Sequence, residues 1–327
     1  MATKEQSEHK EQQLTGIMQL LSEGGFYSGQ AIADKLGVSR AYVWKLIQQL
    51  QDLGLGIESV TGKGYRLEHQ VELLNKAQIE EALHGFSLDL RLITDSTNDK
   101  LKGDGFAHNK LVVAEYQSAG RGRRGRQWVS PLASNLYWSL GWKTQLPVQQ
   151  LGGLSLIVGL AIVKALQQLG ITGVELKWPN DIRYQGRKLG GILVELSGDM
   201  VGGLQVIIGV GLNVHMASNA AESIEQEWIN LQELEPTISR QQLLITVMLC
   251  LQDYLERFSD GGFESFLSEW QRYDECFNKK VAILQGEDVI NGIGAGVDAN
   301  GAFLLQTGKG IKPVYAGEVS LRFREDA

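Results

Sequence analysis

An arginine- and glycine-rich segment is the most distinctive chemical feature of this 327-residue sequence. Residues 117–128 have the sequence QSAGRGRRGRQW, with guanidinium groups at Arg121, Arg123, Arg124 and Arg126. The glycines free the backbone to wrap around a ligand, and each guanidinium offers a permanently charged fork for phosphate or carboxylate. Repulsion among the arginines predicts a loop that stays mobile until an anion binds. A nucleic-acid patch is the alternative, but the net charge of −7 and the flanking apolar segments favour a phosphate-handling loop.

A second group of polar side chains lies in the motif KWPNDI (residues 177–182) and the segment GRKLGGILVE (residues 186–195). Two strands joined by a short turn would bring Asn180, Asp181 and Lys188 to one end of a sheet. A carboxylate beside an amide suits a polar ligand or Mg²⁺, and a lysine suits a phosphoryl group in transfer. The glycine pair would let the strand backbone lie against a flat ligand. The alternative is a structural hairpin with a turn-forming Asn-Asp pair and a solvated lysine.

The strands and helices that must position these groups are expected between residues 71 and 273. Segments rich in β-branched and aromatic residues predict strands, and long apolar or amphipathic stretches predict helices. The predicted strands are residues 111–117, 135–142, 174–178, 189–196 and 204–214, and the predicted helices are residues 153–169, 240–258 and 263–273. The arginine-rich loop therefore follows a strand within a domain that mixes strands and helices.

The first 67 residues predict a small helical unit with a β-hairpin wing. An amphipathic helix ends at Gly24, and two further helices are expected around a turn at Gly37, with Ser39 capping the second. Residues that can share one core are Ile32, Ala33, Leu36, Val38, Val43 and Leu46. The pattern is similar to the helix-turn-helix of bacterial repressors; a helical interaction module is the alternative. The small positive excess over residues 34–66 is too weak for tight DNA binding by one copy, so two would be needed.

Composition and the remaining segments limit the class of protein. The length predicts two or three domains, and the eight glycines within residues 280–322 predict a small all-β barrel. Two cysteines, Cys250 and Cys276, cannot form a disulfide framework or a cysteine-rich metal site. Only residues 1–13 are polar enough to be disordered, and no apolar run is expected to span a membrane or serve as a signal. We expect a cytoplasmic protein.

Five motifs in a fixed order connect the chain to a known family. They are Asp95-Ser-Thr-Asn, the segment 115–128, the KWPNDI motif, the segment KLGGILVE (188–195) and the segment GVGLNV (209–214). This order resembles that of biotin protein ligases, and with the helix-turn-helix in front the chain resembles the bifunctional bacterial biotin ligases and biotin operon repressors. The resemblance implies an α+β multidomain fold. Its domains would be a winged helix-turn-helix over residues 1–68, a class II aminoacyl-tRNA synthetase-like mixed sheet with helices over 69–275, and an SH3-like small β-barrel over 276–327.

The resemblance also implies an activity and partners. Such enzymes join biotin to ATP, with Mg²⁺, to give biotinyl-5′-AMP and pyrophosphate. They then transfer biotin to a lysine of the biotin carboxyl carrier protein of acetyl-CoA carboxylase. The bifunctional members also bind operator DNA as ligand-promoted homodimers and repress biotin synthesis, without any membrane association.

Roles for individual side chains follow from the same motifs. The residues expected around the biotin ureido ring are Ser96, Thr97, Asn98 and Gln117. Those expected to fold over the biotin carboxylate and the α-phosphate are Arg121, Gly122, Arg123 and Lys188. Asp181, supported by Asn180, would assist attack by the carrier lysine or placement of the metal. Trp228 would shelter the adenine after residues 216–227 fold beneath it, and Arg322 would reach the ATP phosphates from the barrel. Arg121, Arg123, Lys188 and Asp181 form the expected catalytic set, and no residue is assigned as a metal ligand.

The expected DNA-facing residues belong to the second helix of the helix-turn-helix and to the wing. They are Ser39, Arg40, Trp44, Lys45 and Lys63. Trp44 departs from the repressor pattern. Its bulky indole would either contact a base step or pack on the wing. Three alternative functions are an active ligase with an idle DNA-binding module, a biotin-sensing repressor without ligase activity, and a ligase for another acid such as lipoate. The phosphate-handling residues favour an active ligase over a sensor, and the motifs fit biotin better than lipoate.

Overall fold

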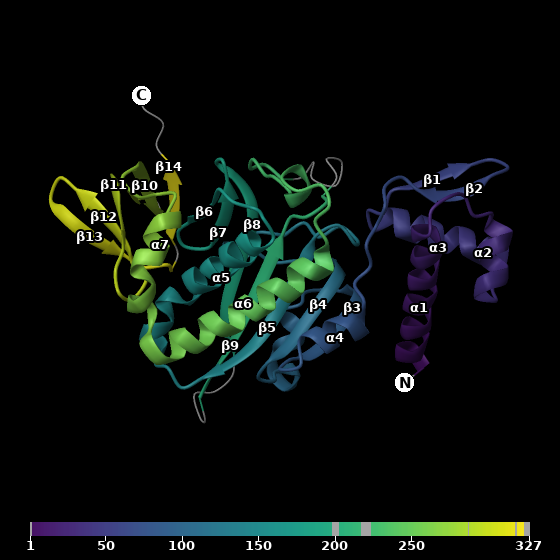
Figure 1. Ribbon diagram of the computed structural model, residues 1–327, viewed down its shortest axis with the longest axis horizontal. Helices are drawn as coiled ribbons and strands as arrows, with labels where there is room; N and C mark the ends of the chain where they lie inside the picture. The colour runs from purple at the N-terminus through teal and green to yellow at the C-terminus, as the bar shows by residue number, and fades with distance from the viewer. Residues whose placement is uncertain (1, 198–202, 217–223, 287, 318, 324–327) are drawn as a thin grey trace.

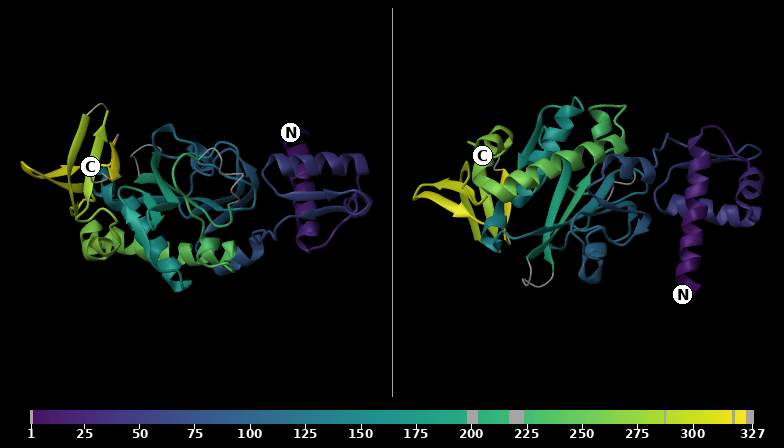
Figure 2. Two further views of the ribbon diagram at one scale, coloured as in Figure 1. Left: turned by 90° about the horizontal axis from the view of Figure 1, so that it is seen from above. Right: turned by 60° about the horizontal axis from the view of Figure 1, so that its bottom comes forward.

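The structure, a computed structural model, describes residues 2–197, 203–216, 224–286, 288–317 and 319–323. Three parts follow one another along the long axis of the molecule (Figure 1). A helical N-terminal unit lies at one end, a large domain built on a β-sheet lies in the middle, and a small β-domain lies at the other end. Two further views show the same arrangement (Figure 2).

The N-terminal unit contains three helices and a hairpin, as its sequence predicts. Its elements are α1 (Ala2–Ser22), α2 (Gly29–Leu36), α3 (Arg40–Asp52), β1 (Ile57–Val60) and β2 (Gly64–Leu67). The side chain of Ser39 accepts a hydrogen bond from the Tyr42 amide and caps α3, and β1 pairs with β2 in antiparallel fashion. Residues 2–13, which are polar enough to allow disorder, are helical, because α1 begins at Ala2. This polar segment consists mostly of good helix formers and contains neither glycine nor proline.

A segment of the central domain completes the core of this unit. Leu132 and Ala133 are almost fully buried among the apolar side chains of the three N-terminal helices. The Leu132 amide donates a 3.1 Å hydrogen bond to the carbonyl of Leu53, which directly follows α3. The N-terminal unit and the central domain therefore share buried apolar surface.

The central domain is built on a seven-stranded sheet in the order β3-β4-β5-β9-β8-β7-β6. Its strands are β3 (Ser87–Thr94), β4 (Lys110–Gln117), β5 (Leu136–Thr144), β6 (Val174–Lys177), β7 (Asp181–Tyr184), β8 (Arg187–Ser197) and β9 (Leu204–Leu212). Only β3 and β4 run parallel, and the other neighbours are antiparallel. The predicted strands are confirmed with shifted ends, whereas β3 and β7 lie outside the predicted ranges.

Helices cover one face of this sheet (Figure 1). The helices are α4 (Lys76–Ala82), α5 (Leu154–Gln168), α6 (Arg240–Gly261) and α7 (Leu267–Tyr273), and the 3₁₀ turns are η1 (Asp99–Leu101), η2 (Gly103–Gly105), η3 (Arg123–Gly125), η4 (Val148–Gly153), η6 (Leu231–Glu233) and η7 (Phe263–Phe266). The stretch Val148–Gln168 is long and apolar enough to pass as a membrane span, with a mean hydropathy of 1.5. This stretch corrects the expectation that no apolar run is long enough to span a membrane. Most of the stretch is buried, because α5 packs between the sheet and α6.

The alternation of side chains along β9 divides the domain into two faces. The even-numbered residues of 206–212 belong to the main core shared with α5 and α6. The odd-numbered positions, Ile207, Gly209 and Gly211, therefore face away from these helices. Two of the three lack a side chain, so side chains from other segments can pack directly against the strand on this second face.

The C-terminal domain is a five-stranded antiparallel sheet in the order β13-β12-β11-β10-β14. Its strands are β10 (Lys280–Gln285), β11 (Asp288–Val297), β12 (Phe303–Thr307), β13 (Gly310–Val314) and β14 (Val319–Phe323). Trp178 of the central domain joins it, because the indole nitrogen donates a 3.0 Å hydrogen bond to the carbonyl of Gly301. The Trp178 ring also lies 5.4 Å from the ring of Phe303.

Arg240, the first residue of α6, is a fully buried arginine. Its Nη1 donates to the Glu115 carboxylate of β4 at 2.8 Å and to the carbonyl of Asn135 at 3.0 Å, and its Nη2 donates to the carbonyl of Glu72. The Glu72 carboxylate accepts in turn from the Arg240 amide at 2.5 Å, and Glu115 accepts from the Leu74 amide at 2.9 Å. One buried charge thus connects the start of α6, the strand β4 and the linker that follows the N-terminal unit.

We expect Arg240→Met to lower the free energy of unfolding by about 3–5 kcal/mol, because it leaves the Glu115 carboxylate buried without a counter-charge. The control is Lys76→Met on α4, which removes an exposed ion pair with Glu80 that contributes about 0–1 kcal/mol. Urea unfolding of both variants measures the difference. Equal, small losses would show that the buried pair is dispensable.

Candidate functional site

One cavity on the helix-free face of the sheet collects most of the predicted site residues. Those that line it are Ser96, Thr97, Asn98, Gln117, Arg121, Gly122, Arg123, Asn180, Asp181 and Lys188. They come from the ends of β3 and β4, the arginine-rich loop and the β7–β8 hairpin. Val319 and Leu321 of β14 also line the cavity, so the C-terminal domain contributes one wall.

One end of the cavity is buried, neutral and rich in hydrogen-bonding groups. Gln117 Oε1 accepts from the Thr97 amide at 2.9 Å and lies 3.2 Å from its hydroxyl, while Gln117 Nε2 donates to Ser130 Oγ at 3.0 Å. Ser139 of β5 lies 2.7 Å from Thr97 Oγ1 and 2.5 Å from Asn98 Oδ1. These side chains hold one another in fixed directions, which suits a neutral ligand with several donors and acceptors.

The indole ring of Trp128 packs against strands β8 and β9 and forms the floor of the cavity. A Cβ atom at Gly211 would lie 2.4 Å from the Trp128 ring, so this position requires glycine. A Cβ at Gly191, the residue paired with Gly211, would lie 3.2 Å from the same ring. Of the adjacent pair Gly190-Gly191, which was expected to lie against a flat ligand, Gly191 faces this side chain of the protein and Gly190 faces Leu212 instead.

The other end of the cavity is strongly cationic. Lys188 Nζ forms a 2.8 Å ion pair with Asp181, as the predicted hairpin requires, and lies 5.5 Å from the Trp128 ring centroid. Burial lowers the pKa of Lys177, and the nearby charge of Arg183 lowers it further. A cation whose charge is destabilised by burial gains more from a bound anion than a solvated one.

Arg123 connects this end of the cavity to the C-terminal domain. Its Nη1 donates to Asn180 Oδ1 at 3.1 Å, and its Nη2 donates to the carbonyls of Ala316 at 3.2 Å and Gly317 at 3.0 Å. Burial lowers the pKa of Arg123, although the carboxylate of Asp181 opposes this effect. No carboxylate lies within ion-pair distance of Arg123 among the described residues, so its charge remains available to an anion.

Arg121, by contrast, is already paired with carboxylates. Its guanidinium donates to Glu195 Oε1 at 3.1 Å and Oε2 at 2.9 Å, and to Asp99 Oδ1 at 2.8 Å. The segment 120–128, called the ligand loop below, is folded, with a 2.8 Å hydrogen bond from the Trp128 amide to the Gly120 carbonyl. Glu195 and Asp99 neutralise one of the arginines whose mutual repulsion predicts a mobile loop, so that repulsion is smaller than the sequence suggests.

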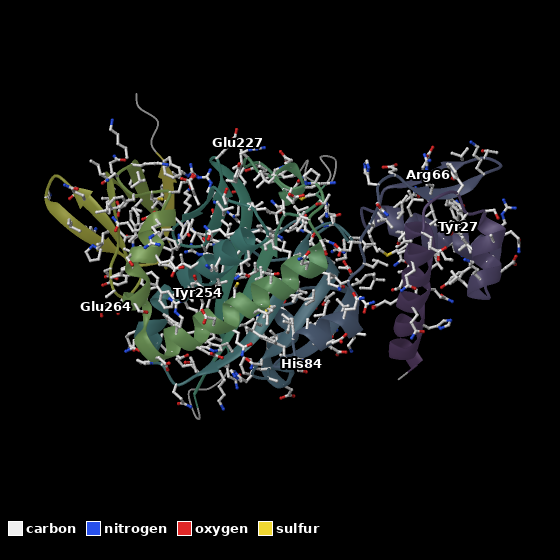
Figure 3. All side chains as sticks on the ribbon, viewed as in Figure 1. Tyr27, Arg66, His84, Glu227, Tyr254 and Glu264 are labelled. Carbon is white, nitrogen blue, oxygen red and sulfur yellow. The ribbon has the colours of Figure 1, made fainter. Side chains whose placement is uncertain are left out.

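Two predicted nucleotide-binding residues do not line the cavity. Trp228 is half-buried beside the Lys188 backbone, whose amide donates to the Glu227 carbonyl at 3.0 Å. Figure 3 shows Glu227 at the edge of the central domain, far from Arg66 of the N-terminal unit. Residues 217–223 of the segment expected beneath Trp228 lie outside the described part of the chain. Arg322 is exposed, because side chains alternate along β14 and its neighbour Leu321 faces the cavity instead.

The predicted DNA-facing residues all lie on the surface of the N-terminal unit. Ser39, Arg40 and Lys45 are exposed on α3 or at its start, and Lys63 is exposed in the β1–β2 turn. Trp44 has 54% of its surface exposed, so it does not pack on the wing. An exposed face on the second helix of this motif is the face that enters the major groove in such DNA-binding units.

Two kinds of chemistry have no ready site here. Among the residues that the structure describes, no three His, Cys, Asp or Glu side chains are grouped to hold a metal. Burial raises the pKa of both thiols, Cys250 and Cys276, and neither lines the cavity. Because one end of the cavity is neutral and polar and the other end is cationic, the cavity suits a ligand with a neutral polar part and an anionic part.

Comparison with known proteins identifies the family of this chain. Residues 91–213 match the biotin/lipoate A/B protein ligase family, residues 13–66 match a helix-turn-helix domain, and residues 277–322 match the biotin protein ligase C-terminal domain. The chain is 40% identical over 311 residues to the bifunctional ligase/repressor BirA of Escherichia coli (strain K12), covering 94% of this chain and 97% of that protein. The chain belongs to the biotin protein ligase family. The bifunctional ligase/repressor BirA of Bacillus subtilis (strain 168) is 31% identical to this chain, and the match covers 93% of this chain and 97% of that protein.

A solved structure of this ligase family matches the described fold. It is the biotin protein ligase from Aquifex aeolicus in complex with biotin and ATP, with a TM-score of 0.65 and 31% identity. The match covers 73% of this chain and 99% of that chain.

Four residues of the ligase site were not assigned a role from the sequence. Ser139, Lys177 and Glu195 lie in strands, and Trp128 ends the arginine-rich motif. The spacing Gly209-Val-Gly211 was a signal for Trp128, since a strand that lacks side chains on one face needs a flat group to cover it. No sequence signal marked Ser139 or Glu195, because their roles depend on pairing between strands.

Proposed function

We propose that this chain is an ATP-dependent biotin ligase that forms biotinyl-5′-AMP and transfers biotin to a lysine of the biotin carboxyl carrier protein of acetyl-CoA carboxylase. The observation that carries the proposal is one continuous cavity with a neutral hydrogen-bonding end and a cationic end. Biotin combines a neutral ureido ring with a carboxylate, and the nucleotide adds phosphates at that carboxylate. One extended ligand thus satisfies both ends.

The neutral end holds the ureido ring. Ser96, Thr97, Asn98 and Gln117 supply donors and acceptors whose directions are set by hydrogen bonds among themselves and with Ser139. Biotin also has an apolar fused ring, which suits the Trp128 indole at the floor. This part of the site binds and orients but does no bond-breaking.

The cationic end handles the carboxylate and the α-phosphate. Arg123 and Lys188 stabilise the negative charge that develops as the biotin carboxylate attacks and pyrophosphate leaves, because both cations are held in place beforehand. Gly122 lets the loop backbone approach the ligand. Bound Mg²⁺ would neutralise charge on the ATP phosphates, and Asp181, a carboxylate that lines the cavity, would either help hold the metal or act in the transfer step.

The transfer step needs no nucleophile of the enzyme, since the adenylate already activates the acyl group. The carrier lysine must lose a proton as it attacks, and Asp181, supported by Asn180, is the candidate acceptor beside Lys188. Trp228 would cover the adenine from its position beside the Lys188 backbone.

The N-terminal unit makes the chain a DNA-binding repressor as well. Ser39, Arg40, Trp44, Lys45 and Lys63 form the proposed contact with operator DNA. One unit carries few cations, so a homodimer on a two-fold symmetric operator is the proposed binding species.

Finer assignments of the fold are also proposals. We infer a class II aminoacyl-tRNA synthetase-like central domain from the mixed sheet with helices on one face, and an SH3-like barrel from the five short antiparallel strands. The proposed domains are residues 1–68, 69–275 and 276–327. A cytoplasmic location accords with the carrier protein as substrate.

Lys188→Ala and Arg123→Ala are each expected to slow biotinyl-adenylate synthesis by about 10²–10³-fold, because each removes a preorganised cation that meets developing charge. The assay is biotin-dependent exchange of pyrophosphate into ATP. The control is Arg187→Ala, next to Lys188 on β8, where an exposed arginine pairs with Glu233. Near-normal synthesis in either site variant would remove that residue from the mechanism.

Deletion of residues 1–68 is expected to abolish operator binding and to leave measurable ligation, because the cavity lies entirely in the other two domains. The deletion also uncovers Leu132 and Ala133, so we expect a lower melting temperature. A second deletion chain with Leu132→Ser guards against aggregation. A soluble, folded deletion chain with no ligation at all would contradict the domain boundary.

Biotinyl-5′-AMP, and not biotin alone, is expected to promote the homodimer. The adenylate would neutralise cations at the cationic end that biotin leaves unpaired, and coupling of about 1–3 kcal/mol raises the dimer population severalfold or more. Sedimentation equilibrium without ligand, with biotin and with adenylate measures this effect. Identical dimerisation in all three would leave a constitutive or idle DNA-binding module.

A further inference from the structure

We propose that Glu195 is a positioning residue that fixes both the biotin-contacting amide of Asn98 and the start of the ligand loop. This inference rests on the proposed function and deepens it. Glu195 lies on β8, lines a neighbouring hollow beside the ligand loop but not the main cavity, and its carboxylate bonds both groups. It therefore acts through its neighbours and not on the ligand.

The strand register explains why Asn98 lies where Glu195 can reach it. Ser139 of β5, Gly209 of β9 and Leu193 of β8 are aligned across the sheet, so their Cβ positions share the cavity face. A Cβ at Gly209 would lie 2.1 Å from Asn98 Oδ1, so the Asn98 side chain occupies the gap that this glycine leaves. Glu195 is two residues beyond Leu193 and faces the same side.

The two neighbours determine which way the Asn98 amide points. A carboxylate can only accept, so the group 2.6 Å from Glu195 Oε2 must be the NH₂ of Asn98. The amide oxygen then faces Ser139 Oγ, which donates to it at 2.5 Å. One N–H of Asn98 remains for the ligand, and its direction is set before biotin arrives.

The same carboxylate anchors the ligand loop. Glu195 accepts two hydrogen bonds from the Arg121 guanidinium, and Asp99 accepts a third. Lys102 lies 2.7 Å from Asp99 and 3.6 Å from Glu195, so two cations and two anions form a cluster with no net charge. A neutral cluster has little attraction for a phosphate. We therefore assign Arg121 a positioning role, in place of the direct phosphate contact that the family resemblance implies.

Glu195→Gln separates these effects from simple loss of volume. A glutamine keeps the size of the side chain, but it removes the charge that holds Arg121 and can present an NH₂ group to Asn98. The control is Asp99→Asn, which weakens the anchor of Arg121 without touching Asn98. Ser139→Ala removes the opposite anchor of the Asn98 amide, together with a contact to the Thr97 hydroxyl, and leaves the loop contacts intact.

The experiment measures biotin binding by calorimetry without ATP, kcat and KM for biotin, and hydrogen exchange of residues 120–128. Glu195→Gln is expected to weaken biotin binding about tenfold or more, since a hydrogen bond to a charged group is lost and the amide is misdirected. Ser139→Ala should weaken biotin binding similarly, and Asp99→Asn should leave it within about twofold. Exchange in the ligand loop should rise in Glu195→Gln and Asp99→Asn but not in Ser139→Ala.

Two results would overturn the proposal. One is biotin binding by Glu195→Gln within twofold of the parent chain, and the other is equal weakening in Asp99→Asn. If Glu195→Gln does not fold, Ser139→Ala decides the orientation of Asn98 and Asp99→Asn decides the anchoring of the loop. Failure of the parent chain to bind biotin at all would instead contradict the proposed function.

Discussion

The ion pair between Arg240 and Glu115 is the interaction on which the arrangement of the other parts depends. A fully buried guanidinium is costly unless each neighbour supplies an acceptor, and here the linker, β4 and the residue before β5 all do so. Glu115 lies two residues before Gln117, where β4 ends and the ligand loop follows. The same contact therefore fixes the exit of the N-terminal unit and the strand from which the site begins.

The chemistry of the site follows from the division of the sheet into two faces. Helices cover one face with apolar contacts, and on the other face glycines of β9 leave space that Asn98 and Trp128 occupy. A ligand at this face meets neutral groups over one part of the sheet and cations over the next. The arrangement of strands thus sets where neutral and charged groups lie along the ligand.

Local patterns in the sequence were sufficient for the N-terminal unit, the main strands and the cavity residues near each motif. The cap of Ser39 on α3 and the ion pair of Asp181 with Lys188 could be predicted, because both depend on the spacing of residues close together in the sequence. The orientation of Arg322 could not be predicted without knowing the register of β14. The ion pair of Arg121 could not be predicted because its partner Glu195 lies on a strand far away in the sequence. Arg240 had no distinguishing signal, since an arginine at the start of a helix is ordinarily solvated.

The burial of Leu132 and Ala133 within the N-terminal unit means that the domain border in space differs from the border in sequence. A chimera that exchanges residues 1–68 between relatives would keep the wrong two core residues. Successful grafts should therefore also exchange the short segment that follows Ser130. Variation in that segment would then track the DNA-binding unit of each homologue, although the segment itself belongs to the ligase.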